Sequence, residues 1–507
     1  MSKASPGRFT NAASVGPRRP GRREPPSEPG RGGTVKAGER APLAVGPVMR
    51  EQTAPRPHGA DGPETSGADG FSARVAYVFG TQVFSAAIGT VTGFLLARLL
   101  GPSGKGEYYL IVLLPTTIMV LIQLGLPQAF SFYAARGQVR GAIAASLTTT
   151  VGLSLIAFGA TLVALPTLSQ TVVRGPPPAL IGLGLLAIPL TLNATMTTDI
   201  VIGRQAVRSY ALVQISYSLC SLILVVLLVG VLGISVSGAV AAFLLASAIQ
   251  AGGFLLAAIR VTRRVPQPTG VTCCDLFRFG LPLYPGSLAQ FFSYRADVYL
   301  LAWLLASPSV QLGYYSLAVS LAEMVFFVSN AVAALYFPRV AGSSRATSDR
   351  EVAAMTRVTL ELTAAAGLAL VPAAAILVVV LLPAFVPSLS ALYVLLPGVV
   401  ALSVAKVLSG YLSGLGMTGL TSTVNASGVA LNVIANVLLI PHFGIVGAAS
   451  ASLLSYSATS IAFTVIVGRL AGASRLEFWI PRVADARLAA ASVAAMAARA
   501  GFHYGGT

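Results

Sequence analysis

The sequence predicts an all-α, polytopic membrane protein whose roughly 12 transmembrane helices form two six-helix halves. Three observations predict it: the composition, a series of apolar segments long enough to span a membrane, and an internal repeat. Of the 507 residues, 55% are hydrophobic and 10% are charged, and the mean hydropathy is +0.77. Because a soluble globular protein carries roughly 25% charged residues, this composition excludes an ordinary soluble enzyme.

The first 70 residues differ from the rest of the chain. They are rich in Pro, Gly, Arg, Ser and Glu and contain no long apolar run. Such a segment cannot bury enough apolar surface to offset the entropy cost of ordering, so we expect residues 1–70 to be a disordered cytoplasmic tail. They also lack the apolar stretch of a secretory signal. Met49 is an alternative start, because residues 1–48 resemble translated upstream sequence.

Between Phe71 and Arg469 the chain divides into apolar segments of 18 to 28 residues. At 1.5 Å per residue, each can cross a hydrocarbon core of roughly 30 Å. The expected spans are 74–98, 107–134, 141–165, 179–203, 209–232, 237–259, 281–305, 312–336, 357–381, 387–412, 419–440 and 444–468.

The distribution of Lys and Arg between the loops predicts the orientation. Connections from even to odd spans carry twelve cations: Arg136, Arg140, Arg204, Arg208, Arg260, Arg263, Arg264, Arg278, Arg339, Arg345, Arg350 and Arg357. Connections from odd to even spans carry three: Arg98, Lys105 and Arg174. Since cation-rich short loops stay inside, both termini are expected in the cytoplasm.

An internal repeat divides these spans into two halves. The sequence LLARLL at 95–100, followed by GEYYL at 106–110, recurs as LLAWLL at 300–305, followed by GYYSL at 313–317. Because both copies have the same predicted orientation, the halves should be related by an axis along the membrane normal, with a substrate path between them.

The repeat also sets the expected domain boundaries. They are a six-helix N-lobe at 71–262, a cytoplasmic linker at 263–280, a six-helix C-lobe at 281–470 and a cytoplasmic tail with an interfacial helix at 471–507.

The net charge of +17 raises nucleic acid as a partner, but the cations are scattered between apolar runs. They form no basic surface interleaved with aromatic residues, so we expect no nucleic-acid binding. The three cysteines, Cys220, Cys273 and Cys274, have no second CxxC or His cluster beside them. We therefore expect no metal site and no cofactor.

Several motifs resemble bacterial polysaccharide and oligosaccharide flippases of the multidrug/oligosaccharidyl-lipid/polysaccharide exporter superfamily. They are FLLARLLGPSGKGEYYLIVLL at 94–114, LGLPQAF at 124–130, FGLPLYPGSLAQFFSYRADVYLLAWLL at 279–305, GYYSLA at 313–318 and LNVIANVLLIPHFGIVGAASASLLSYS at 431–457.

The resemblance implies two six-helix lobes around a central cavity. It further implies a non-enzymatic flippase of the bacterial plasma membrane that moves polyprenyl-diphosphate-linked oligosaccharides by alternating access, for cell-surface polysaccharide biosynthesis. Glycosyltransferases or a polymerase of the same pathway are then possible partners. Lipid II flippases of the superfamily usually have two further helices, which makes that sub-function a weaker expectation.

Four ionisable residues at membrane depth are the candidate substrate-binding residues: Arg295, Asp297, Glu323 and Lys406. Ionisable groups at this depth face a cavity or a partner. Arg295 and Asp297 are two residues apart, about 200° around a helix, so only one can face a cavity. The planar fork of Arg suits a diphosphate, which favours Arg295 as the headgroup contact. The sequence also allows Arg295 to pair with Glu323 or Asp297, and Lys406 to neutralise Asp297.

Two rival functions remain open. A multidrug or cation antiporter of the same fold would need acidic residues in the first half, and the first three spans contain none in their apolar core. A membrane-embedded polysaccharide polymerase or ligase would need catalytic groups at the interface, but the only histidines are His58, His442 and His503. The sugar and the coupling ion, H⁺ or Na⁺, are not indicated by the sequence.

Overall fold

The computed structural model describes residues 65–135, 139–171, 173–263, 272–342 and 345–480, and these contain helices and turns but no strand. The expected tail up to residue 64, residues 264–271 of the expected linker and the expected interfacial helix after residue 480 lie outside the described residues. The all-α prediction is confirmed for the described part of the chain.

The first helix, α1 (Thr65–Ile122), contains two of the expected spans. Gly101 interrupts it with a φ of 67°, in the left-handed region that favours glycine, and Pro102 follows. The second expected span, 107–134, is itself broken: α1 ends at Ile122, and α2 (Leu126–Ala135) begins after a turn in which Leu124 and Gly125 both have positive φ. The sequence did not indicate this second break.

The remaining helices of the N-terminal half follow the expected spans closely. They are α3 (Val139–Thr171), α4 (Pro178–Leu185), α5 (Ala187–Gly203), α6 (Val207–Val225), the π-helical η1 (Val226–Val231) and α7 (Val236–Arg263). Together α4 and α5 form the expected span 179–203, and α6 with η1 forms the expected span 209–232.

A short helix, α8 (Cys273–Gly280), precedes the C-terminal half. Thr272 and Asp275 form a capping box at its start, and the hydrogen bonds from Thr272 hold the pKa of the Asp275 carboxyl below its usual value. Leu276 is fully buried in a cluster with residues of α2 and α5, so α8 packs on the N-terminal half.

The C-terminal half follows the same pattern. Its elements are η2 (Leu281–Leu283), α9 (Tyr284–Leu304), α10 (Pro308–Gly342), α11 (Arg345–Leu381), η3 (Pro383–Phe385), α12 (Ser388–Gly414), α13 (Thr418–Ala471) and η4 (Arg475–Phe478). The helix α13 contains the last two expected spans, because Gly444, at a φ of 55°, interrupts it as Gly101 interrupts α1. After α13 the chain turns back: Phe478 is fully buried, and the Trp479 Nε1 donates to Thr464 Oγ1 at 3.2 Å.

Within the described residues, nine helices are long and apolar enough to cross a membrane. Two of them, 77–122 and 418–471, are 46 and 54 residues long and contain the interruptions at Gly101 and Gly444. The charged helix α9 is not one of the nine, although it coincides with the expected seventh span. The chain is a multi-pass membrane protein, and the count of twelve spans stays a prediction.

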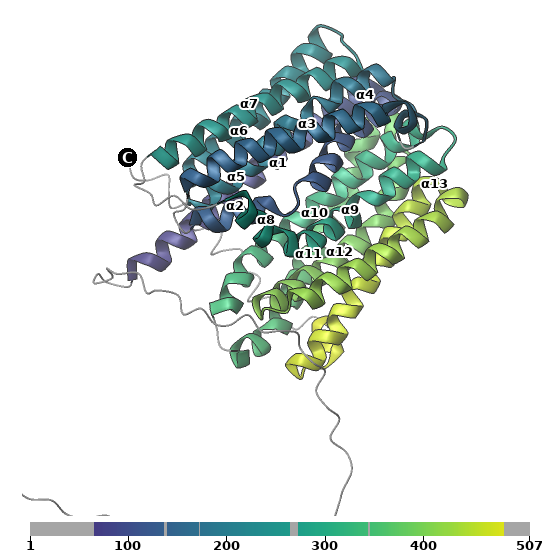
Figure 1. Ribbon diagram of the computed structural model, residues 1–507. Helices are drawn as coiled ribbons and strands as arrows, with labels where there is room; N and C mark the ends of the chain where they lie inside the picture. The colour runs from purple at the N-terminus through teal and green to yellow at the C-terminus, as the bar shows by residue number, and fades with distance from the viewer. Residues whose placement is uncertain (1–64, 136–138, 172, 264–271, 343–344, 481–507) are drawn as a thin grey trace, which may run out of the picture. The chain divides into compact units, whose positions relative to one another are not determined.

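The helices lie in two groups, α1 to α7 and α9 to α13 (Figure 1). In the first group α5 packs on α2, α3 and α7, and α6 packs on α1 and α7. In the second, α12 is central and packs on α10, α11 and α13, while α9 packs on α13. The groups meet mainly where α1 packs on α10.

The contact between α1 and α10 is made by two glycines that the internal repeat relates. A Cβ on Gly106 would overlap the Ser309 carbonyl oxygen, and a Cβ on Gly313 would overlap the Pro102 carbonyl oxygen. Each helix therefore approaches the other's backbone through its own repeat glycine. The repeat sequence accordingly builds the contact between the halves, which sequence comparison alone did not indicate.

A second contact joins the two groups near the end of α1. Gly125 and Gly280 approach backbone to backbone, so that a Cβ on either would overlap the other residue. Nearby, the Tyr284 hydroxyl donates to the Leu121 carbonyl at 2.8 Å, and Gln128 Nε2 donates to Ser287 Oγ at 3.1 Å. The two groups thus touch on both sides of the segment 107–121.

Candidate functional site

Arg295 of α9 lies where the two helix groups meet. Arg295 Nη1 is 3.1 Å from Glu323 Oε1 on α10, and it also donates to the Tyr109 hydroxyl on α1 at 3.1 Å. The Arg295 side chain keeps 26% of its surface exposed and that of Glu323 keeps 37%. The guanidinium therefore bridges the two halves, and the pairing with Glu323 that the sequence left open is present.

Asp297 lies on a different side of the same helix, as its two-residue offset from Arg295 requires. It is 4% exposed and accepts hydrogen bonds from the Tyr315 hydroxyl on α10 and from the Val298 amide, the latter at 2.8 Å. Its contacts lie within the C-terminal half. Of the two charged residues, Arg295 is the one at the contact between the halves.

Lys406 of α12 does not pair with Asp297. Its Nζ donates to Asn330 Oδ1 at 2.8 Å and lies 3.8 Å from the ring centroid of Phe326 and 5.9 Å from that of Tyr294. Such cation–π contacts stabilise an ammonium by about 0.5–2 kcal/mol. The alternative in which Lys406 neutralises Asp297 is therefore not what the structure shows.

Lys105 is a buried cation that the sequence reasoning missed. It was counted as a loop residue, but the helix restarts directly after Pro102, so Lys105 lies in the first turn of that segment. Its side chain is 7% exposed and turns back along α1, with Nζ 3.4 Å from the Gly93 carbonyl oxygen. The proline after Gly101 was the signal that could have placed it in a helix.

Lys105 and Glu323 line the same cavity, of about 220 Å³, between α1 and α10. Its walls are otherwise apolar or small, and they are Ala86, Gly89, Thr90, Gly93, Phe94, Leu317, Ser320, Leu321, Met324 and Phe327. A Cβ on Gly89 would meet no atom within 4 Å. Gly89 and Gly93, four residues apart on α1, therefore line the cavity, and Gly89 borders open space.

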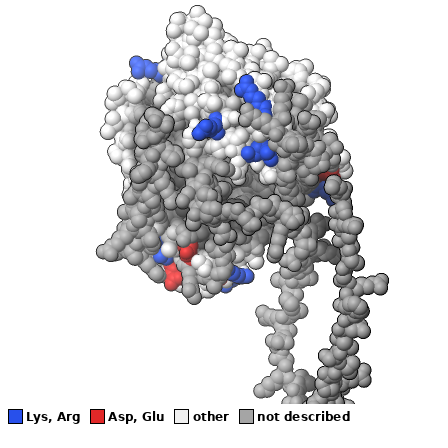
Figure 2. All heavy atoms as spheres, turned by 90° about the vertical axis from the view of Figure 1, so that its left-hand side faces the viewer, with Lys and Arg blue, Asp and Glu red and all other residues white. Residues whose placement is uncertain are grey.

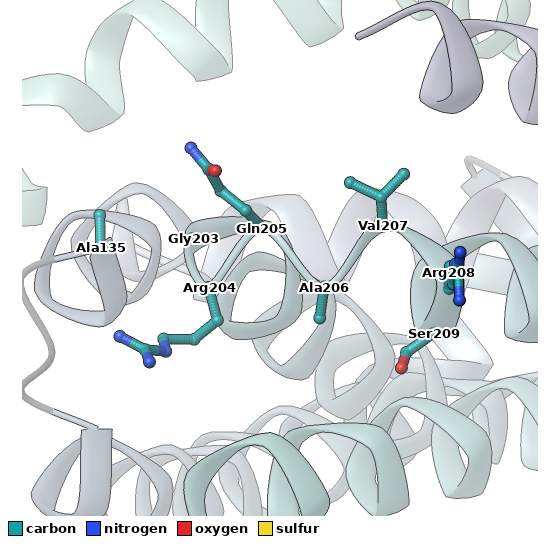
Figure 3. Close-up of a pocket in the computed structure, with 8 residues that line it drawn as sticks. All are labelled: Ala135, Gly203, Arg204, Gln205, Ala206, Val207, Arg208 and Ser209. Carbon is teal, nitrogen blue, oxygen red and sulfur yellow. The ribbon is translucent and has the colours of Figure 1, made fainter. Parts of the chain in front are cut away.

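A larger cavity, of about 740 Å³, lies elsewhere, at the turn between α5 and α6. Figure 3 shows its lining: Gln205 and Val207 point to one side of the turn and Arg204 to the other, and the Arg204 and Arg208 side chains do not point toward one another. Without converging groups, this hollow is a weaker candidate site than the contact between α1, α9 and α10.

Cations also mark one end of the helices. Arg204 and Arg208 at the α5–α6 turn, Arg260 at the end of α7 and Arg278 on α8 are among the cations that the sequence assigns to cytoplasmic loops. Figure 2 shows Lys and Arg side chains over the upper part of the left-hand side of Figure 1, where the described residues form the surface. The described residues contain no group of three His, Cys, Asp or Glu side chains that could hold a metal ion.

The chain is similar to known transporters. The lipid II flippase MurJ in an inward closed conformation has a TM-score of 0.63 and 13% identity, covering 83% of this chain and 98% of that one. An inward-facing multidrug resistance MATE family transporter of the MOP superfamily has a TM-score of 0.61 and 15% identity, covering 76% and 94%. A MOP superfamily transporter from Pyrococcus furiosus has a TM-score of 0.50 and 14% identity, covering 79% and 95%.

At these identities the similarity shows the fold, which is that of transporters and flippases. No curated protein matches the sequence. The family model described as polysaccharide biosynthesis protein matches residues 72–343, more than half of the chain. The chain belongs to the polysaccharide biosynthesis protein family, the group that its sequence motifs resemble.

Proposed function

We propose that the protein is a flippase that moves a polyprenyl-diphosphate-linked oligosaccharide across the bacterial plasma membrane for cell-surface polysaccharide biosynthesis. Membership of the polysaccharide biosynthesis family supports the pathway, and the likeness in fold to MurJ supports a lipid-linked substrate. The observation that carries the proposal is the Arg295 guanidinium, which contacts both halves of the molecule where α1, α9 and α10 meet.

Arg295 fits a diphosphate because its donors form a planar fork that matches phosphate oxygens. In the structure this fork contacts the Glu323 carboxylate and the Tyr109 hydroxyl. When no substrate is bound, the Glu323 carboxylate occupies the anion position beside Arg295, and the diphosphate displaces this carboxylate. The exchange replaces one anion by another at Arg295, so the guanidinium is never left without a partner in a membrane interior.

The same contact couples binding to movement. A ligand shifts a conformational equilibrium only when its contacts differ between the two states. Arg295 touches α1 of one half and α10 of the other, so a diphosphate bound there contacts both sides of a joint that must change in alternating access. The glycine contacts at Gly106–Gly313 and at Gly125–Gly280 are the places where such a joint can open at either end.

The main rival is a multidrug or cation antiporter, because the MATE transporter has a similar fold. The charges favour the flippase. Three cations, Arg295, Lys406 and Lys105, lie in or beside this region against two carboxylates, Glu323 and Asp297, which is an excess of positive charge. An excess of positive charge suits an anionic substrate, whereas a site for cationic drugs would need the reverse.

A vesicle experiment tests the function. The purified protein is placed in vesicles that contain a polyprenyl diphosphate with one fluorescent sugar, and an impermeant reductant is added outside. The flippase predicts that nearly all the fluorescence is lost, against about half in protein-free vesicles. A polyprenol-linked sugar without phosphate is the control and should stay half protected. Half protection of the diphosphate probe, together with cation-gradient-driven efflux of a cationic dye, would establish the antiporter instead.

A further inference from the structure

Lys105 stands apart from the other buried charges of the described residues. Its ammonium has three donors, and its contacts are the Gly93 carbonyl at a long 3.4 Å and the ring of Tyr108, whose centroid is 5.9 Å away. The ion pairs found in the described part of the chain do not include Lys105. A cation that is 93% buried, without a carboxylate in an ion pair, is costly and calls for an anion.

The position of Lys105 relative to Arg295 indicates which anion it would bind. Lys105 precedes Tyr109 by four residues, so the two side chains share a face of α1 one helical turn, about 6 Å, apart. The Tyr109 hydroxyl contacts Arg295 at 3.1 Å. Glu323, the ion-pair partner of Arg295, lines the cavity that Lys105 lines. One cavity therefore runs from the Lys105 ammonium to the Arg295 ion pair.

We infer that Lys105 is a second cationic contact for the substrate's diphosphate, one helical turn nearer the Gly101 interruption than the Arg295–Tyr109 contact. The inference rests on the proposed function and adds a residue to its site. An anion that displaces Glu323 from Arg295 lies at the wall of the cavity into which Lys105 projects. Its second phosphate, or the same phosphate after it moves along α1, accepts hydrogen bonds from the Lys105 ammonium.

The two cations also offer the anionic group a path. The Lys105 ammonium lies beside Gly93 on the first part of α1, and Arg295 contacts Tyr109 on the second part. An anionic group that moves between them exchanges one buried cation for another without exposing the diphosphate to hydrocarbon.

The test compares Lys105→Met with Arg98→Gln in the vesicle assay described above. Both changes remove one positive charge near the Gly101 interruption, but Arg98 is exposed and does not line the cavity. We expect Lys105→Met to slow translocation of the diphosphate probe about tenfold or more, since a charged hydrogen bond contributes about 1.5–3 kcal/mol and 1.4 kcal/mol is tenfold. Lys105→Arg should retain most of the rate, and Arg98→Gln should equal the wild type.

Thermal unfolding separates ligand binding from a structural role. Removing a buried cation that has no carboxylate should leave the unfolding midpoint of the empty protein unchanged or higher, and should reduce the rise in midpoint caused by the soluble short-chain diphosphate probe. A lower midpoint of empty Lys105→Met, or recovery of its transport when Glu323→Gln is added, would overturn the inference, because Lys105 would then only balance Glu323.

Two further outcomes keep the inference apart from the proposed function. If Arg295→Lys slows translocation while Lys105→Met matches Arg98→Gln, the flippase stands and the role of Lys105 is wrong. If the wild type fails to move the probe at all, the function itself is wrong.

The assay is run in vesicles with and without anionic phospholipid. A Lys105→Met defect confined to anionic vesicles would assign Lys105 to a bilayer headgroup and overturn its contact with the substrate.

Discussion

The buried and half-buried charges of the C-terminal half have close polar or aromatic contacts, whereas the buried Lys105 of the N-terminal half has only distant ones. Asp297 accepts two hydrogen bonds and Lys406 contacts Asn330 and an aromatic ring, all on helices α9, α10 and α12. Lys105 on α1 has a long contact to a backbone carbonyl and lies 5.9 Å from the centroid of the Tyr108 ring. Arg295 lies between these extremes, because it is paired but its partners come from both halves.

The difference separates charges that stabilise a half from charges that are available to a ligand. A satisfied buried group is retained for structure, and removing its partner leaves a desolvated group unpaired. A buried charge without a partner lowers stability and is kept when function requires it. These contacts support the proposal that Asp297 and Lys406 stabilise the C-terminal half and that Lys105 and Arg295 bind the substrate.

The largest expected effect concerns the topology on which this comparison depends. In a background whose three cysteines are replaced, a cysteine at Ser307 should react fully with an impermeant thiol reagent applied to intact cells, because Ser307 is exposed and lies in an expected outer loop. A variant whose only cysteine is Cys273, exposed in α8, should react only after the cells are opened. The opposite pattern would reverse the predicted orientation of α1 and α8.

Next in size is the effect of a side chain at the contact between the halves. Gly106→Leu should yield little folded protein, because a Cβ there overlaps the Ser309 backbone and the cost is about 3 kcal/mol or more. Gly89→Ala on the same helix is the matched control, since its Cβ would meet no atom within 4 Å. Size-exclusion yield and thermal unfolding measure both. Equal, normal yields would show that the two halves do not meet at Gly106.

Asp297→Ala should lower the free energy of unfolding by about 1–3 kcal/mol, because it leaves the buried Tyr315 hydroxyl without its acceptor. Tyr315→Phe, which also removes the hydrogen bond, should cost less, and the double variant should cost less than the sum of the two. A double-mutant cycle by thermal unfolding gives the coupling. If Asp297→Ala were fully stable but unable to translocate the probe, Asp297 would belong with the ligand-binding group.

Lys406→Met should have the smallest effect, a loss of about 1 kcal/mol in stability with translocation nearly unchanged. The lost contacts are the hydrogen bond to Asn330 and the cation–π contact with Phe326. Lys406→Arg should recover the stability, since Arg can replace both contacts. For Lys105→Met we expect the reverse, slower translocation without a loss of stability. A translocation defect in a stable Lys406→Met protein would contradict the separation of the two classes of charge.

Much of the fold could be predicted from the sequence, because the length and hydropathy of a segment identify it as a membrane helix. Each expected span coincides with helix in the described residues, and the opposite placement of Arg295 and Asp297 follows from their spacing alone. The break at Leu124 and Gly125 could not be predicted, because it lies against the backbone of Gly280, a contact between residues more than 150 positions apart.

The same limit explains what was missed at the site. The sequence places Lys105 in a loop because it lies between two apolar runs, and its burial depends on α10, which closes the cavity from the other half. The pairing of Arg295 with Glu323 was one of several alternatives, since helix spacing fixes faces but not which faces meet. Phe478, fully buried after α13, lies in a stretch that the sequence assigned to a tail.

The most direct test of the ligand-binding role of Arg295 measures folded yield and probe translocation together for Arg295→Ala, Arg295→Lys and the double variant Arg295→Ala/Glu323→Gln. The diphosphate site predicts normal folded yield with translocation nearly abolished in Arg295→Ala, partial translocation in Arg295→Lys, and no recovery in the double variant. Low yield of Arg295→Ala, with both yield and translocation restored by Glu323→Gln, would instead show that Arg295 only pairs with Glu323 and does not bind the substrate.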